Sequence, residues 1–253
     1  MAKAVLVDIT RCMGCRGCQV SCKQWHEQQG LQTVFKGELT NPPELNVETC
    51  TTVHFIETMH NKLPVWSFVK EQCYHCHQPV CVVACPVGAL EANADGAVTR
   101  TAAECAKGCT ACVEACPFHI PKRDETARNS DVQKCNFCDE RIMAGDQPAC
   151  IKACPSEALY FDDRDKVTAE AEKRIAAEPD KYVKHIYGLK EAGGTNWLYI
   201  SHLPFTELGF EEVPEQGLFS AVSTPVPPQA AKLLTMAGAV ASFRNRGARE
   251  SRS

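Results

Sequence analysis

The sequence lacks the features of several large protein classes. A transmembrane helix needs about 20 apolar residues, and the best stretch here, 233–243, holds eleven uncharged residues between Lys232 and Arg244. Residues 1–8 contain neither the apolar region nor the cleavage site of a signal peptide. The formal net charge is only −4, which does not indicate a nucleic-acid partner. We therefore expect a protein without an integral membrane span of its own.

Signatures of catalysis on a substrate are also missing. The chain has no glycine-rich nucleotide-binding fingerprint and no convincing catalytic triad. We therefore predict no catalytic residues in this chain.

Cysteine, in contrast, is abundant, at 17 of 253 residues. Sixteen of these cysteines fall into four groups of four with nearly the same spacing, and in the last three groups proline follows the fourth cysteine. This is the ligand pattern of bacterial ferredoxins, so it predicts four 4Fe–4S iron–sulfur clusters with iron bound by these cysteines. The groups are Cys12, Cys15, Cys18 and Cys22; Cys73, Cys76, Cys81 and Cys85; Cys105, Cys109, Cys112 and Cys116; and Cys135, Cys138, Cys150 and Cys154.

Two other uses of cysteine are weighed against iron–sulfur clusters. A disulfide framework is typical of small secreted domains, and the odd cysteine count and two-residue spacings argue against it. Zinc sites use paired CxxC motifs, but they seldom use CxxCxxC followed by CxxxCP. A zinc-binding structural protein is kept as the weaker alternative.

The four groups are diverged copies of one unit. A small residue precedes each last cysteine, and the stretch Cys85–Leu90 is echoed by Cys154–Leu159. Internal repetition of this kind indicates a repeated half-ferredoxin.

Local patterns predict short elements around the cysteines. Lys3–Asp8 reads as a strand, and Ala89–Glu91 and Ala97–Arg100 read as a hairpin in which Gly96 takes a positive φ. Further strands are expected at Thr51–Glu57 and Leu159–Phe161.

Helices are expected in two places. Short helices should begin just after the third cysteine of a group and end near the Cys-Pro pair, because the residue before proline avoids the helical region. A longer helix is expected over Val167–Glu178, ended by Pro179.

The expected fold class is α+β: two ferredoxin-like double-cluster modules of short strands and helices, plus an insertion and an extended C-terminal strap. Residues 1–165 would form the four-cluster domain, with the insertion at 23–72. Residues 166–212 would form a helix and C-terminal extension. Residues 213–253 would form a proline-rich linker and basic tail without a complete transmembrane helix.

In ferredoxins three ligands of a cluster come from one tight loop, and the cysteine before proline ligates the other cluster of a pair. Only 19 residues separate Cys85 from Cys105, a normal ferredoxin gap, so groups two and three should pair and leave groups one and four to pair with each other. Sequential pairing, one with two and three with four, is the competing arrangement. The predicted ligand sets are set one (Cys12, Cys15, Cys18, Cys154), set two (Cys22, Cys135, Cys138, Cys150), set three (Cys73, Cys76, Cys81, Cys116) and set four (Cys85, Cys105, Cys109, Cys112).

Three groups depart from the usual two-residue spacing: four residues lie between Cys76 and Cys81, eleven lie between Cys138 and Cys150, and group three opens with a longer gap that makes Cys105 the least secure ligand. Three residues, 106–108, follow Cys105 where two are usual. A missing thiolate at Cys105 would leave a three-iron cluster there.

The four-group pattern resembles the iron–sulfur (beta) subunits of molybdenum or tungsten enzymes of the dimethyl sulfoxide reductase superfamily, and within it the beta subunits of formate dehydrogenases. The resemblance covers about residues 3–210. The matching stretches are Asp8–Cys18, Cys22–Trp25, Cys116–Pro121, Cys135–Arg141, Pro148–Pro155 and Gly193–Asn196.

This resemblance implies the pairing of group one with four and two with three, and a catalytic partner subunit that holds a molybdenum or tungsten pterin. Membrane-bound relatives end in a transmembrane helix that docks a cytochrome b subunit. Residues 230–253 depart from that pattern, which favours a soluble complex with a cytochrome or another soluble electron acceptor. The expected location is the cytoplasm, with periplasmic export of the folded chain by a signal-bearing partner as the alternative.

The predicted function is therefore electron transport by a non-catalytic, metal-binding subunit of an oxidoreductase complex, a formate dehydrogenase. The alternative is the same relay role in a hydrogenase or another molybdopterin oxidoreductase.

Several residues outside the ligand sets also have candidate roles. Cys50 stands apart from the groups and is expected to be a small buried residue. His75 and His77, inside group two, either tune a cluster through hydrogen bonds or serve packing. Three lysines beside ligands either offset the charge of a thiolate-ligated cluster or lie on a solvated face: Lys23, Lys134 and Lys152.

Overall fold

The fold is mixed α+β, with short helices and small sheets. The computed structural model describes residues 2–35, 37–60, 62–124 and 130–215, all within the unit Met1–Phe219. The tail expected at 216–253 lies outside the described residues. None of the described helices is both long enough and apolar enough to cross a membrane. The helices are α1 (Gly17–Trp25), α2 (Val80–Val83), α3 (Ala111–Ala115), α4 (Asp139–Met143), α5 (Ala149–Lys152) and α6 (Arg164–Ala177), with 3-10 turns at Ala102–Glu104, Glu191–Gly193 and Phe205–Leu208.

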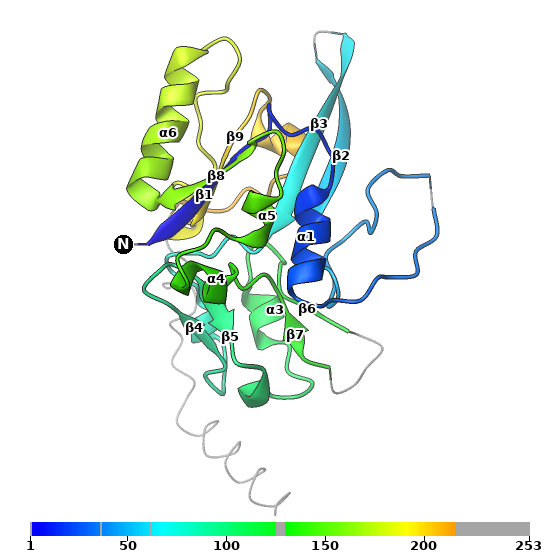
Figure 1. Cartoon of the computed structure of the whole chain (residues 1–253), viewed down its shortest axis with the longest axis vertical. Helices are drawn as coiled ribbons and strands as arrows, with labels where there is room; N and C mark the ends of the chain where they lie inside the picture. The colour runs from blue at the N-terminus through cyan, green and yellow to red at the C-terminus, as the bar shows by residue number, and fades with distance from the viewer. Residues whose placement is uncertain (1, 36, 61, 125–129, 216–253) are drawn as a thin grey trace, which may run out of the picture. The chain divides into compact units, whose positions relative to one another are not determined.

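A three-stranded sheet joins the two ends of the described chain (Figure 1). Its central strand is β1 (Lys3–Asp8), which pairs antiparallel with β8 (Leu159–Asp163) and parallel with β9 (Trp197–Ile200). The strand predicted over Lys3–Asp8 is confirmed, and the one predicted at Leu159–Phe161 continues to Asp163.

Both faces of β1 are covered, which explains why it is apolar along its length. Successive side chains of a strand point to opposite faces. Ala4 and Leu6 pack against α6 through Val167 and Ala171. The alternate residues, among them Val5, face a larger core beside the cysteine loops. The helix predicted at Val167–Glu178 is confirmed as α6, which begins three residues earlier.

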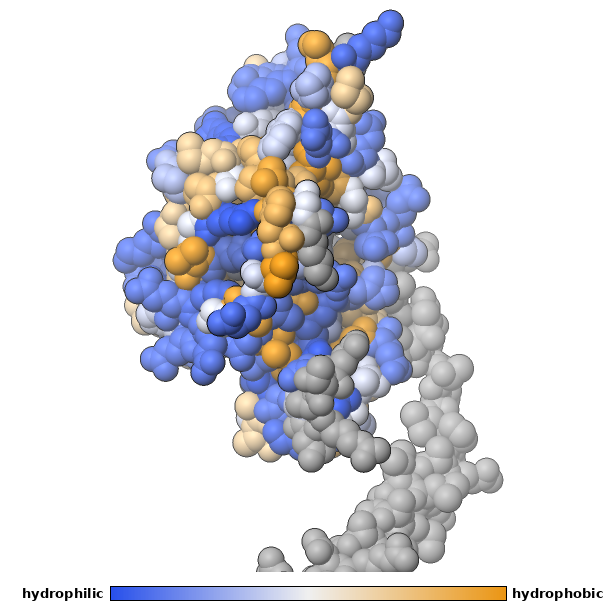
Figure 2. All heavy atoms as spheres, turned by 90° about the vertical axis from the view of Figure 1, so that its right-hand side faces the viewer, coloured by the Kyte–Doolittle hydropathy of each residue, from blue (hydrophilic) through white to orange (hydrophobic). Residues whose placement is uncertain are grey.

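The insertion contains a long antiparallel hairpin of β2 (Thr51–His60) and β3 (Leu63–Gln72). Only part of β2 was predicted. The base of the hairpin is buried and its tip is exposed. Figure 2 shows apolar side chains gathered on the face that carries the insertion and the hairpin. Exposed apolar residues of these segments are Trp25, Leu31, Val34, Phe35, Leu39, Met59, Leu63 and Trp66.

Two shorter hairpins lie among the central cysteine groups. One pairs β4 (Leu90–Ala92) with β5 (Val98–Arg100), and the other pairs β6 (Lys122–Arg123) with β7 (Val132–Gln133). The first hairpin was predicted, and Gly96 in its turn has φ +86°. A Cβ at Gly96 would lie 2.5 Å from Asn196 Nδ2, so glycine is also required sterically.

The short helices of the cysteine groups begin earlier than predicted. α2, α3 and α5 each start one residue before the third cysteine of their group rather than after it, so that cysteine lies in the first turn. They end before the Cys-Pro pair, as expected. No proline follows Cys22, and α1 accordingly continues to Trp25.

Candidate metal centres

All seventeen cysteines carry free thiols. The disulfide interpretation is therefore wrong for this structure. Among the sixteen grouped cysteines only Cys15 is exposed; the others are buried or half-buried. Cys50 is also buried, 6% exposed, and accepts a hydrogen bond from Gln28 Nε2 at 3.0 Å.

Set one gathers at the start of the chain. Burial raises the pKa of Cys12 to about 11, the Gly14 amide partly offsets the rise, and the charges of Cys18, Cys154 and Cys15 add to it. Thiolates repel each other in this way only when they lie close together. The structure thus brings Cys154 to the first cysteine loop from far along the sequence.

Set two gathers beside it. Burial raises the pKa of Cys135 well above its usual value, and the charges of Cys22 and Cys138 raise it further. The pKa of Cys22 is raised by burial first and then by Cys50, with Cys150 and Cys138 also contributing. Cys50 is thus a near neighbour of this set, which sequence spacing did not indicate.

Set three combines group two with the last cysteine of group three. Burial raises the pKa of Cys76 well above its usual value, and the charges of Cys73, Cys116 and Cys81 raise it further.

Set four combines group three with Cys85. Burial raises the pKa of Cys112 to about 11, with the charges of Cys105, Cys109 and Cys85 adding to the rise. Cys105 therefore lies with its predicted partners despite the three-residue spacing that follows it.

A left-handed residue precedes the second cysteine in each group. These residues turn the loop so that backbone amides point inward at sulfur. The Phe137 amide donates to Cys135 Sγ at 3.3 Å, and the Gly14 amide reaches Cys12. The four residues and their φ values are Gly14 (+65°), His75 (+50°), Gly108 (+80°) and Phe137 (+66°).

Neighbouring sets interact with each other in one order. A thiol of set one interacts with a thiol of set two, one of set two with one of set three, and one of set three with one of set four. The sets therefore form a continuous string from one to four. The linking pairs are Cys18 with Cys150, Cys135 with Cys73, and Cys81 with Cys112.

His75 carries an unused donor at the centre of this string. Its ring is fully buried and stacks on Phe137 with 4.7 Å between ring centroids. The Val98 amide donates to Nδ1 at 2.9 Å, which places the ring proton on Nε2. Nε2 is buried and has no hydrogen-bond partner among the described residues. An orphaned buried N–H is costly, and thiolate or sulfide sulfur is an acceptor that suits it.

Of the three lysines singled out from the sequence, only Lys134 is buried. It is 8% exposed, and its Nζ donates to the carbonyl oxygens of Val98 and, at 3.0 Å, Cys135. Sequence reasoning missed a second buried lysine, Lys70, which is 3% exposed in β3.

His77 and the 193–196 segment meet at group two. His77 Nε2 lies 2.9 Å from Asn196 Oδ1, and Cys76 forms an isolated β-bridge with Thr195. Burial lowers the pKa of His77, so this histidine is neutral at pH 7.

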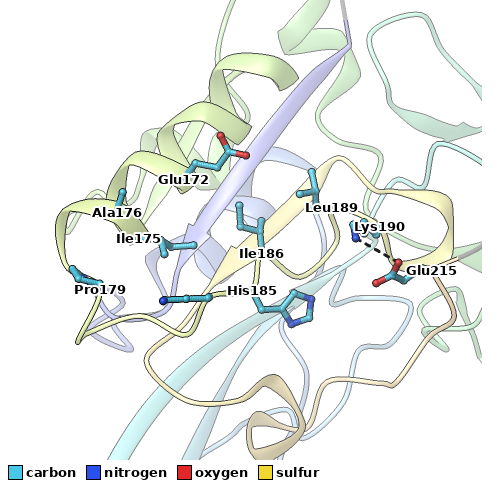
Figure 3. Close-up of a pocket in the computed structure, with 10 residues that line it drawn as sticks. Glu172, Ile175, Ala176, Pro179, His185, Ile186, Leu189, Lys190 and Glu215 are labelled. Carbon is cyan, nitrogen blue, oxygen red and sulfur yellow. Dashed lines mark ion pairs between the residues drawn. The ribbon is translucent and has the colours of Figure 1, made fainter.

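A hollow of about 430 Å³ beside α6 contains no cysteine. Figure 3 shows aliphatic side chains of α6 and of the following segment around it, with the Lys190–Glu215 ion pair at its edge. The hollow is therefore lined by no thiol that could bind iron.

The chain is similar to known iron–sulfur proteins. The 4Fe-4S dicluster domain family matches residues 64–164. The beta subunit of formate dehydrogenase 2 (cytochrome c-553) of Nitratidesulfovibrio vulgaris is 40% identical over 73% of this chain and 87% of the relative. The iron–sulfur subunit of the nitrate-inducible formate dehydrogenase of Escherichia coli K12 is 34% identical over 79% of this chain and 68% of the relative.

A third relative belongs to another system: the hydrogenase-2 operon protein HybA of Escherichia coli O157:H7 is 30% identical over 81% of this chain and 71% of the relative. The identities to formate dehydrogenase subunits, over most of both chains, decide the classification. The chain belongs to the family of formate dehydrogenase iron–sulfur (beta) subunits.

Proposed function

We propose that this chain relays electrons through four 4Fe–4S clusters between the molybdenum or tungsten pterin subunit of a formate dehydrogenase and an electron acceptor. A bound 4Fe–4S cluster supplies reversible one-electron chemistry. The observation that carries the proposal is the continuous string of four thiol sets. A relay needs such a string because each redox centre must lie close to the next.

The four sets are proposed as the ligands of one cluster each. The crossed pairing is supported by helix packing, since α1 packs on α5 and α2 packs on α3. These contacts join group one to group four and group two to group three, as two ferredoxin-like modules would. The inward amides and the unused His75 donor supply the hydrogen bonds that cluster sulfurs accept.

The zinc alternative is less well supported by the geometry. Four thiolates around one zinc ion lie about 2.3 Å from it. Among the described residues, no three His, Cys, Asp or Glu side chains are placed to share a single ion. A 4Fe–4S cluster binds its four thiolates through separate iron atoms, so it does not require them to share one ion.

The partner is proposed from the relatives. The matched formate dehydrogenase subunits imply a catalytic subunit, and the exposed apolar residues of the insertion and hairpin are typical of a protein interface. The name of the Nitratidesulfovibrio vulgaris relative includes cytochrome c-553, which supports a soluble cytochrome as acceptor. The similarity to HybA supports the second candidate, a relay in a hydrogenase complex.

Two further expectations stay predictions. One is the division of the chain at residues 165 and 212. The other is a cytoplasmic location, with folded export alongside a signal-bearing partner as the alternative.

Reduction of the purified complex by its own substrate tests the function. The chain is isolated anaerobically with its partner, treated with formate or with hydrogen, and examined by EPR for reduced 4Fe–4S clusters. The proposal predicts that formate, and not hydrogen, reduces the clusters. Reduction of the clusters by hydrogen and not by formate would contradict this proposal and support a relay in a hydrogenase complex.

A further inference from the structure

Lys70 is a buried cation held in the middle of the protein. It lies on β3 with only 3% of its surface exposed. Its Nζ donates hydrogen bonds to Thr51 Oγ1 at 2.8 Å and to Gln72 Oε1 at 2.7 Å. It also lies 4.3 Å from the centroid of the Trp197 ring. The side chain is therefore fixed in one position by two strands and an aromatic face.

No carboxylate among the described residues forms an ion pair with Lys70. Its neighbour Glu71 points to the other side of the strand, because side chains alternate, and pairs there with His54 at 2.7 Å. The two hydrogen-bond acceptors and the aromatic ring are uncharged. A buried ammonium without a counter-charge is expensive, so the fold is expected to supply an anion close by.

The cysteine loops of sets one and two lie beside Lys70. The Trp197 ring that Lys70 faces has its centroid 5.9 Å from that of Phe137, which belongs to the set-two loop. Phe68 lies two residues before Lys70 on the same face of β3 and borders Gly14 of the set-one loop. The anions within reach of Lys70 are therefore the cysteine thiolates of these two sets.

We propose that the Lys70 ammonium is the fixed counter-charge of the two iron–sulfur clusters held by sets one and two, and that it raises their reduction potentials. The inference rests on the proposed function. Reduction adds one electron and hence one negative charge to a cluster, with no bond made or broken. A cation fixed nearby stabilises the reduced form more than the oxidised form, because its attraction grows with the negative charge.

Lys70→Met removes the charge and keeps the length of the side chain. The variant is purified within its anaerobic complex and titrated with redox mediators while EPR follows each cluster. Two clusters should become about tenfold harder to reduce at a fixed potential, a fall of about 59 mV for a one-electron couple. The other two clusters should keep their potentials. The matched control is Lys173→Met, on the exposed face of α6, which should shift none.

A second variant keeps Lys70 and places a compensating negative charge beside it. Thr51→Asp puts a carboxylate where Oγ1 now accepts the Lys70 hydrogen bond, so the ammonium remains but its charge is compensated. The clusters of sets one and two should again become harder to reduce. If Lys70→Met does not assemble, this variant tests the proposal on its own.

Unchanged potentials in Thr51→Asp, or an equal shift of all four clusters in Lys70→Met, would overturn the proposal. Wild-type protein without 4Fe–4S signals would overturn the proposed function instead, so the two failures are distinguishable.

Discussion

Gly14→Ala is expected to destabilise the first cysteine loop. Gly14 lies between Cys12 and Cys15 with φ +65°. A Cβ at this position would come within 2.8 Å of Cδ1 of Phe68. The Phe68 ring is also held by an edge-to-face contact with Phe55, with 4.9 Å between the ring centroids. The loop therefore has no free space for the added methyl group.

Two contributions to the free energy of destabilisation add up for Gly14→Ala. An L-residue in the left-handed region costs roughly 1–2 kcal/mol. Inserting an extra carbon into a packed site costs about 1–3 kcal/mol. The expected loss of stability is therefore roughly 2–5 kcal/mol, and a loss of 3 kcal/mol lowers the unfolding temperature of a chain of this size by about 6–12 °C.

Gly209→Ala is the matched control. Gly209 has a similar φ of +73°, and a Cβ there would meet nothing within 4 Å. It carries only the backbone cost, roughly 1–2 kcal/mol. The assay compares the unfolding temperatures of the two variants and the iron content of each after anaerobic purification. Gly14→Ala should unfold at the lower temperature and contain less iron. Equal unfolding temperatures and full iron in both variants would refute the packing argument.

Three further predictions concern a buried ion pair, the seventeenth cysteine and pH. Asp8→Asn should lower stability by about 3 kcal/mol in thermal unfolding, because fully buried Asp8 pairs with Arg174 at 3.1 Å; no change would contradict this reading. Cys50→Ser should retain full iron by metal analysis, whereas Cys22→Ser should lose about one iron if a three-iron cluster remains and about four if the whole cluster is lost; equal iron in both would count against set two. Burial lowers the pKa of His202 below 6.5, so the stability it contributes is present above that pH and is lost as pH falls. His202→Gln should therefore lose less stability than wild type between about pH 7.5 and 5.5, and identical pH profiles would show that His202 does not contribute.

Features set by local chemistry were predictable from the sequence. The short apolar run within Lys3–Asp8 predicted the correct bounds of β1, and the turn residues around Gly96 predicted the β4–β5 hairpin. The cysteine spacing is a local pattern too, and the structure brings the predicted sets together. The helix ends followed the Cys-Pro pairs, but the starts of α2, α3 and α5 did not, because each of these helices includes the residue before the third cysteine of its group.

Features set by long-range packing were not predictable. Strand β9 is buried on both faces and pairs with β1 from nearly 200 residues away. It therefore shows neither alternation nor a local partner. Lys70 looks like an ordinary polar strand residue, and only the packing of β2, β3 and Trp197 around it shows that it is buried. Cys50 was correctly expected to be buried, yet its proximity to Cys22 depends on the path of the insertion.

Iron and acid-labile sulfide analysis of the anaerobically purified chain tests the central claim most directly. Four 4Fe–4S clusters predict about sixteen irons and about sixteen sulfides per chain. About fifteen irons, with the EPR signal of a three-iron cluster, would mean that one of the sixteen cysteines is not a ligand, and Cys105 would be the first to test by substitution. Stoichiometric zinc without iron or sulfide would contradict the relay altogether.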